Sequence, residues 1–280
     1  MTDRLAWSDG DELVLLTAEQ LREAHAGGNE PGHPFWGNQY TGGAGGPDDE
    51  EREEAEQNLA DGELQDEAGM SMARGEFVAQ VEDAIGPRGA AVASDALTIG
   101  RSVLGGKVTL QVDPEAQSLL VSTQSTRGSM DRLYRQVGGQ LEVEHLSFEV
   151  EEEYQGMGHA KEMMGLSMRS YLDNGVAAVN VSAGYEVGGY AWARAGFEAR
   201  NEGEFRSEVF KSAGWGRLSS ERQDELMAGM DKHGTKSPAW LASQPEGRSI
   251  LLGSQWAGRL DLRSEYGRKV AERFAYGGDE

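Results

Sequence analysis

The sequence contains no cysteine, and this absence excludes several kinds of chemistry at once. The chain can form no disulfide, offers no thiolate to a metal ion and has no cysteine nucleophile. Its five histidines are scattered without metal-ligand spacing, so no metal site is predicted. It also contains no apolar run near the roughly 20 residues that a membrane-spanning helix needs, and residues 1–4 lack the features of a secretion signal. We therefore expect a cytoplasmic protein that has no membrane partner.

Basic residues are scarce: 26 Lys and Arg stand against 48 Asp and Glu, which gives a formal net charge of −22. Such a balance argues against direct nucleic-acid binding, because that binding relies on a basic surface. The acidity could keep the protein soluble, or it could mimic nucleic acid and block a DNA-binding enzyme. Much of the charge is local. Residues 48–67 hold eleven acidic residues and one arginine, which is ten of the 22 net negative charges.

Shifts in composition divide the chain into four segments. These are a small N-terminal segment (1–26), a Gly/Pro-rich and then acidic arm that we expect to be flexible (27–68), a folded core (69–213) and a C-terminal helical extension that packs on the core (214–280). The arm also contains the segment Gly32–Gly43, which has three aromatic residues and could dock on a partner protein.

Apolar spacing predicts the order of elements in the core. Two helices come first, separated at Gly86-Pro87, and three strands are expected over 107–112, 118–123 and 140–150. The alternation of the third strand slips at Glu144-His145, where a β-bulge would restore the inward register. A strand is expected within 175–183 and helices near 190–197, 220–232, 237–241 and 266–276.

The most informative stretch is Gln155–Ala160, with the sequence Gln-Gly-Met-Gly-His-Ala, between the strand that ends at Val150 and an amphipathic helix. Glycine allows the backbone to come close to a ligand, because no Cβ intervenes. The N–H groups of the first helical turn and the helix dipole favour an anion at such a place. The turn therefore predicts a phosphate or pyrophosphate cradle, although a tight turn without a ligand would have the same sequence.

This stretch resembles the signature of the GNAT-type N-acetyltransferase superfamily, Gln/Arg-x-x-Gly-x-Gly/Ala, which Gln155, Gly158 and Ala160 match. The resemblance extends from about Val143 to Phe197 and includes a closing helix that ends in Gly-Phe. It implies an α/β (α+β) fold with a central mixed, splayed sheet flanked by helices. It also implies that acetyl-coenzyme A (acetyl-CoA) is the co-substrate and that an amine, which the sequence does not identify, accepts the acetyl group.

The resemblance also assigns the residues that would hold acetyl-CoA. The backbone of Phe148 and Val150 would lie along the pantetheine arm. The phosphate-facing set would be Gln155, Gly156, Met157, Gly158, His159, Ala160 and Lys161. Lys161 adds a local cation to the backbone amides. The helix dipole disfavours the protonated form of His159, which we interpret as a neutral packing residue.

Three residues are candidates for proton transfer. Glu149 and His145 lie on the strand that ends at Val150, and either could take a proton from the attacking amine. His145 falls in the expected bulge, so alternation does not fix the direction of its side chain. In the superfamily a tyrosine often protonates the leaving thiolate, but Trp192 occupies the matching position here. Tyr185 lies at the predicted end of the next strand, and its hydroxyl could reach the cleft from another direction.

A second function stays open, which is a non-catalytic GNAT-like module that binds a partner or builds a structure. The segment Gly32–Gly43 resembles short segments of tailed-phage head and portal-associated proteins. The chain could therefore come from a phage or mobile element and be associated with the virion. Trp192 and the long C-terminal addition favour this alternative. Under it, the N-terminal arm would contact the protein partner.

Overall fold

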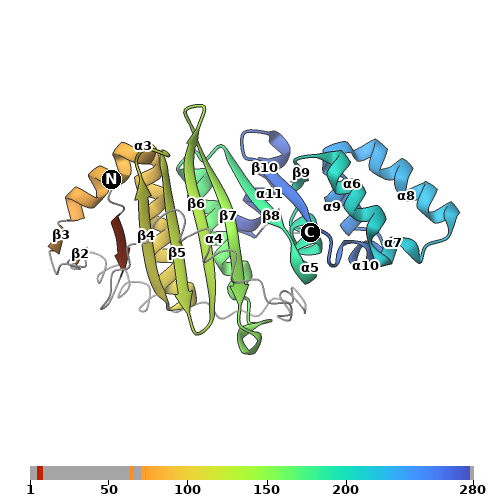
Figure 1. Ribbon diagram of the computed structural model, residues 1–280, viewed down its shortest axis with the longest axis horizontal. Coiled ribbons are helices and arrows are strands. Elements are labelled where there is room, and N and C mark those ends of the chain that lie inside the picture. The colour runs from red at the N-terminus through yellow and green to blue at the C-terminus, as the bar shows by residue number, and fades with distance from the viewer. Residues whose placement is uncertain (1–4, 9–63, 66–70, 73, 278–280) are drawn as a thin grey trace.

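The computed structural model of the protein describes residues 5–8, 64–65, 71–72 and 74–277 (Figure 1). Most of the small N-terminal segment, the segment Gly32–Gly43 and almost all of the acidic arm lie outside the described residues. Predictions made for them therefore stay predictions.

A mixed sheet of eight strands forms the centre, in the order β1-β4-β5-β6-β7-β8-β10-β9. Its strands are β1 (Leu5–Ser8), β4 (Lys107–Asp113), β5 (Ser118–Ser125), β6 (Gly128–Val137), β7 (Gln140–Val150), β8 (Ala178–Ala183), β9 (Glu198–Ala199) and β10 (Trp256–Asp261). Neighbouring strands are antiparallel except β7 and β8, which run parallel. β2 (Leu64–Gln65) and β3 (Ser71–Met72) form a separate pair. The predicted mixed sheet flanked by helices is confirmed.

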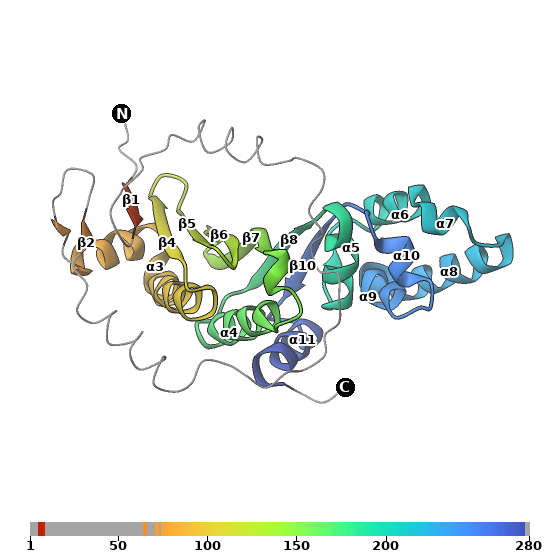
Figure 2. The same cartoon turned by 90° about the horizontal axis from the view of Figure 1, so that it is seen from below.

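Three helices cover one face of the sheet: α3 (Arg74–Ile99), α4 (His159–Asp173) and α11 (Glu265–Tyr276), as Figure 2 shows. α3 continues into the π-helical η1 (Gly100–Leu104) and is kinked at Gly86, whose φ is 79°, next to Pro87. The kink stands where the sequence predicts a break between two helices. None of the helices within the described ranges is both long and apolar enough to cross a bilayer.

The C-terminal part differs from the purely helical extension predicted for residues 214–280, because β10 lies inside the sheet between β8 and β9. The helices that precede it are α6 (Glu202–Lys211), α7 (Ala213–Gly216), α8 (Ser220–His233), α9 (Ser237–Ala242) and α10 (Gly247–Leu251). They form a helical segment between β9 and β10 that projects at one end of the sheet (Figure 1). Trp256 and Leu260 are buried on β10.

β6 is absent from the strands predicted above. Its buried positions include Met130, Arg132 and Tyr134, while Leu133 on the opposite face is only half-buried. An inward arginine and an outward leucine hide the alternation of apolar and polar residues that identifies a strand. The strand is recognised only from its pairing with β5 and β7.

β7 and β8 are paired along only part of their length. Their ladder joins residues 142–145 of β7 to residues 178–181 of β8, and the pairing ends at His145 and Val181. On its other side β7 pairs His145 with Arg132 and Ser147 with Asp131, so Leu146 is the extra residue of a bulge. The bulge was expected at Glu144-His145 and lies one residue farther on. Beyond it the two strands diverge toward their carboxyl ends (Figure 1).

A polar clamp holds β7, β8 and β10 together where they are paired. Arg259 donates from both Nη atoms to the two oxygens of Glu142, over 2.7 and 2.9 Å. Asn180 donates to Glu142 over 3.0 Å and accepts from Arg259 over 3.0 Å. The hydrogen bonds from Arg259 hold the pKa of Glu142 below its usual value. Bidentate pairs of this kind fix geometry as well as add energy, so the clamp sets the register of three strands.

We expect Glu142→Gln to lower the free energy of unfolding by about 2 kcal/mol at pH 7, because Arg259 loses its charged partner while half-buried. Since the folded-state pKa of Glu142 lies below the ordinary value of 4.5, its ionic contribution is present above that pH and is lost as the pH falls below it. Urea unfolding at pH 7 and pH 3 measures the difference, which should shrink at pH 3. Glu149→Gln on the same strand is the control. An equal loss in both variants would contradict the clamp.

Candidate functional site

The glycine turn at the start of α4 has the geometry of an accessible backbone surface. Gly156 and Gly158 have φ values of 79° and 93°, in the left-handed region that favours glycine. A Cβ at either position would meet no atom within 4 Å, so both residues border open space. Gly158 is the N-cap of α4, and no side chain caps the helix there. The amides of the first turn are therefore not occupied by a capping side chain and can face a ligand.

Gln155 ties this turn to the end of β7. Its Nε2 donates to the carbonyl oxygen of Val150 over 3.0 Å. His159 is half-buried, and its ring lies 6.4 Å from that of Tyr154, which agrees with its interpretation as a packing residue. Met157 is 60 % exposed at the tip of the turn. The structure thus brings the predicted phosphate-facing residues together in one short turn.

Charges of both signs surround the turn. The 3-10 helix η2 (Glu152–Tyr154) precedes it, and residues 151–153 are three exposed glutamates. Lys161 is exposed in the first turn of α4. Arg127 lies at the same end of the sheet, where its carbonyl accepts from the N–H of Glu151 over 2.9 Å. The Arg127 guanidinium itself is directed to the carbonyl of Val103, over 3.5 Å. Attraction for an anion at the turn would therefore have to come from the amides and from Lys161 at short range, not from the net charge.

The strand residues lie as alternation predicts. Phe148 and Val150 are buried on the helix-covered face, in a small apolar cluster with Met130 and Met163. Glu149 points to the opposite face and pairs across the ladder with Ser129. The core role of Phe148 and Val150 is compatible with a ligand that contacts only their backbone.

His145 is buried beneath the helices, with 3 % of its surface exposed. Its Nε2 lies 2.9 Å from the hydroxyl of Tyr171 on α4. Its ring lies edge-on to that of Trp192 on α5 (Tyr185–Arg194), with the ring centroids 5.9 Å apart. Burial, together with the positive charge of Arg132, lowers the pKa of His145 to about 3. The imidazole is therefore neutral at physiological pH, and it is a poor match for the general base that the sequence suggested.

Arg132 is the cross-strand neighbour of His145 and is fully buried. Its guanidinium donates to the Ser167 hydroxyl over 3.2 Å and to the Ala96 carbonyl over 3.3 Å. Within the part of the chain that the structure describes, it forms no ion pair with a carboxylate. Burial opposes its charge, but interactions with Tyr134 and Tyr171 outweigh burial and raise the pKa of Arg132. The sequence offers no signal for such an arginine, because a strand arginine is ordinarily exposed.

Three polar atoms of this cluster are buried and have no hydrogen-bond partner among the described residues: Arg132 Nε, the Tyr134 hydroxyl and His145 Nδ1. Burial raises the pKa of Tyr134 well above its usual range, so its hydroxyl stays protonated. Unsatisfied buried groups are rare and costly in native proteins. We call Arg132, Tyr134, His145 and Tyr171 the buried polar cluster. Of these four residues, only His145 is predicted from the sequence as a site residue.

Two of the predicted catalytic residues, His145 and Glu149, are not brought together. His145 lies on the helix-covered face, and Glu149 lies on the opposite one. Tyr185 is the first residue of α5, directly after Gly184, and its side chain lies outside the described part of the structure. Within the described ranges, no group of three or more His, Cys, Asp or Glu side chains could hold a metal ion.

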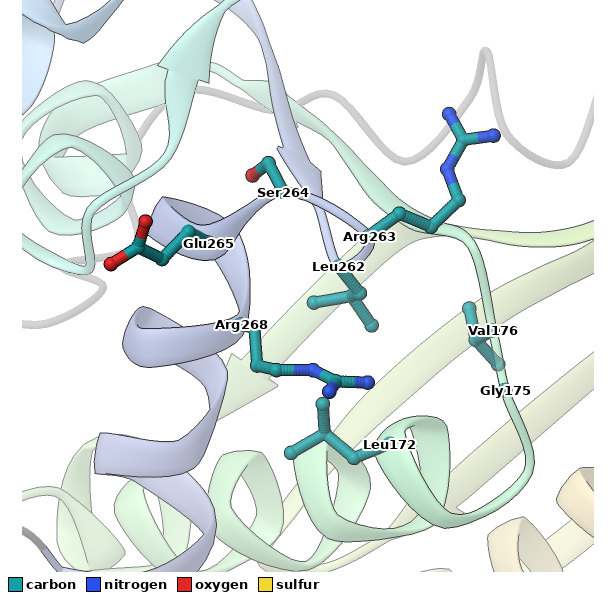
Figure 3. Close-up of a pocket in the computed structure, with 8 residues that line it drawn as sticks. All are labelled: Leu172, Gly175, Val176, Leu262, Arg263, Ser264, Glu265 and Arg268. Atoms are coloured by element: carbon teal, nitrogen blue, oxygen red, sulfur yellow. The ribbon is translucent and has the colours of Figure 1, made fainter.

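A pocket of about 540 Å³ lies at the other end of α4. Leu172, Val176 and Leu262 contribute its apolar lining, and Figure 3 shows Arg268 reaching from α11 over Leu172, while Arg263 points away. The 15 residues of α4 place this pocket about 22 Å along the helix from the glycine turn. It is therefore separate from the predicted cradle.

Comparisons of the chain with protein-family models, with curated proteins and with solved structures find no match.

We expect His145 to stay neutral in the folded protein from pH 8 down to pH 5, because its pKa is lowered to about 3. Between pH 6.5 and about 3 the unfolded chain then binds a proton that the folded chain does not. Protonation of this one group in the unfolded chain therefore lowers the free energy of unfolding by up to about 1.4 kcal/mol for each unit by which the pH falls within that window. Nitrogen-15 NMR of labelled histidine, assigned by loss of the signal in His145→Gln, follows the titration. A folded-state midpoint near 6.5 would contradict the burial argument.

Proposed function

We propose that the chain is an N-acyltransferase that binds acetyl-CoA and transfers its acetyl group to an amine. The observation that carries the proposal is the juxtaposition of two features at one end of the sheet. The ladder between β7 and β8 stops at His145, and the uncapped glycine turn opens α4 directly after β7. An extended ligand with an anionic end could place its arm along β7 and its phosphates on the turn.

The pyrophosphate would be held by the backbone amides of residues 156–160. Helix N-termini bind such anions through oriented N–H groups and the helix dipole. Lys161 adds positive charge in the first turn of α4, while charges beyond about 8 Å are screened at physiological salt. Because ten of the 22 net negative charges are in residues 48–67, the remainder of the chain opposes an anion less than its total charge suggests.

The pantetheine arm would lie along the backbone of β7 at Phe148 and Val150, past the point where pairing with β8 ends. Positioning two reactants supplies much of the acceleration of acyl transfer, since a thioester is already activated. Backbone N–H groups aimed at the carbonyl oxygen would stabilise the developing oxyanion. The substrate would thus be held mainly by backbone, which suits a site lined with core side chains.

The proton of the amine needs an acceptor. Glu149 is half-buried on the face away from the helices, whereas His145 is neutral and covered. We therefore assign the base to Glu149, which could act directly or through water. The Tyr185 hydroxyl remains a proposed donor at the start of α5. The acceptor amine would approach from the face on which Glu149 lies.

A non-catalytic GNAT-like module is the second candidate, and the burial of His145 favours it, because one proposed catalytic group is covered in this structure. Under this alternative the turn keeps its shape without acetyl-CoA, and the N-terminal arm contacts a protein partner. The two candidates differ in whether the folded protein binds the co-substrate.

Calorimetric titration of acetyl-CoA into the full chain and into Gly158→Glu tests the proposal. We expect binding in the micromolar range for the wild type and at least a tenfold loss in the variant, because the new carboxylate lies where the pyrophosphate would sit. Gly139→Glu is a matched control. Gly139 also has a positive φ, of 76°, and open space where a Cβ would lie, but it is in the β6–β7 turn. The control should bind like the wild type.

Absence of binding by a well-folded wild type would overturn the acyltransferase proposal and support the non-catalytic module. Equal binding by wild type and Gly158→Glu would place acetyl-CoA somewhere other than the glycine turn.

A further inference from the structure

The buried polar cluster contains a positive charge with no negative partner in the described structure. Arg132 is fully buried, and its guanidinium contacts the neutral oxygens of Ser167 and Ala96. Burying an unpaired charge is strongly unfavourable unless something compensates for it. A group that becomes negative during the function of the protein would provide that compensation.

Tyr171 is placed to be that group. Its hydroxyl lies 2.9 Å from Nε2 of His145, and Tyr171 follows by one helical turn Ser167, whose hydroxyl accepts from Arg132. In the relay proposed below, the Tyr171 O–H donates to Nε2. A neutral imidazole that accepts at Nε2 carries its proton on Nδ1. That atom is buried and has no acceptor in the described structure.

We propose that His145 and Tyr171 form a proton relay in which His145 Nδ1–H protonates a leaving thiolate and Arg132 stabilises the resulting Tyr171 phenolate. The inference rests on the proposed acyl transfer. It accounts together for three otherwise separate features of the described structure, namely the guanidinium without a carboxylate partner, the unpartnered Nδ1 atom and the neutral histidine.

The amine nitrogen forms the C–N bond, and the C–S bond of the thioester breaks with its electron pair going to sulfur. Sulfur takes the proton from Nδ1 of His145, and Nε2 takes the proton of the Tyr171 hydroxyl. The phenolate is left paired with Arg132. The amine releases one proton to water. One proton from water then returns to Nδ1 of His145 while Nε2 gives its proton back to the Tyr171 phenolate, which restores both groups, so no other reactant is needed.

The position of His145 suits this role. It is the last residue of β7 that pairs with β8, so it stands where the two strands begin to diverge. The half-buried ring of Trp192 lies edge-on to it, with the two ring centroids 5.9 Å apart. A ligand arm that shifts the indole aside would reach Nδ1 directly. His145 would then contact the reacting sulfur, while Arg132 acts only through Tyr171.

Two variants that each delete one buried hydroxyl test the relay. Tyr171→Phe removes the proposed donor, and Tyr134→Phe removes a hydroxyl on the same face that has no partner. The assay follows acetyl transfer from acetyl-CoA to hydroxylamine, a small nucleophile that needs no dedicated acceptor site. We expect about a 100-fold lower rate in Tyr171→Phe, an unchanged Kd for acetyl-CoA, and wild-type behaviour in Tyr134→Phe.

Nitrogen-15 NMR of labelled histidine gives a second readout that does not depend on activity. The relay requires that His145 is protonated on Nδ1 in the wild type and loses this fixed tautomer in Tyr171→Phe. Protonation on Nε2, or an equal rate in Tyr171→Phe and wild type, overturns the relay and leaves the acyltransferase proposal standing. Failure of the wild type to bind acetyl-CoA overturns both.

Discussion

The ion pair between Glu142 and Arg259 is the constraint on which the arrangement of the site depends. It lies across β8, and with Asn180 it fixes three strands at the end where they are paired. Because that end is fixed, the bulge at Leu146 can turn the rest of β7 away from β8 without loss of register. The divergence of the strands, the direction in which β7 reaches the glycine turn and the position of His145 at the fork all follow from this one clamp.

The sequence predicts local features of this fold well and long-range ones poorly. The turn, the helix after it and the bulge in β7 could be predicted, since each depends on residues that are neighbours in the chain. The position of β10 between β8 and β9 could not, because pairing between distant segments leaves no local signal. β6 was missed for a different reason. Arg132 faces inward there, and only the hydroxyls and carbonyls that surround it make that orientation tolerable.

The candidate site shows the same division. The residues of the glycine turn could be predicted from their order alone, as could the opposite faces of Phe148 and Glu149. Tyr171 falls on the apolar face of its helix, where an aromatic residue is expected to be core, and nothing in its neighbours indicates a partner on β7. Packing of one helix on two strands brings Tyr171, His145 and Arg132 together. Their proximity therefore becomes visible only in three dimensions.

The insertion of β10 between β8 and β9 also has a consequence for how the chain folds. Ala183 pairs with Trp256, so one edge of β8 has no partner until the helical segment and β10 have both been synthesised. Unpaired strand edges invite mispairing and aggregation. At typical rates of synthesis, the intervening residues take about 4 to 15 seconds to appear. The helices α6–α10 have mainly local contacts, which form quickly. Their early collapse would shorten the distance that β10 must cover and the time for which the nascent sheet is vulnerable.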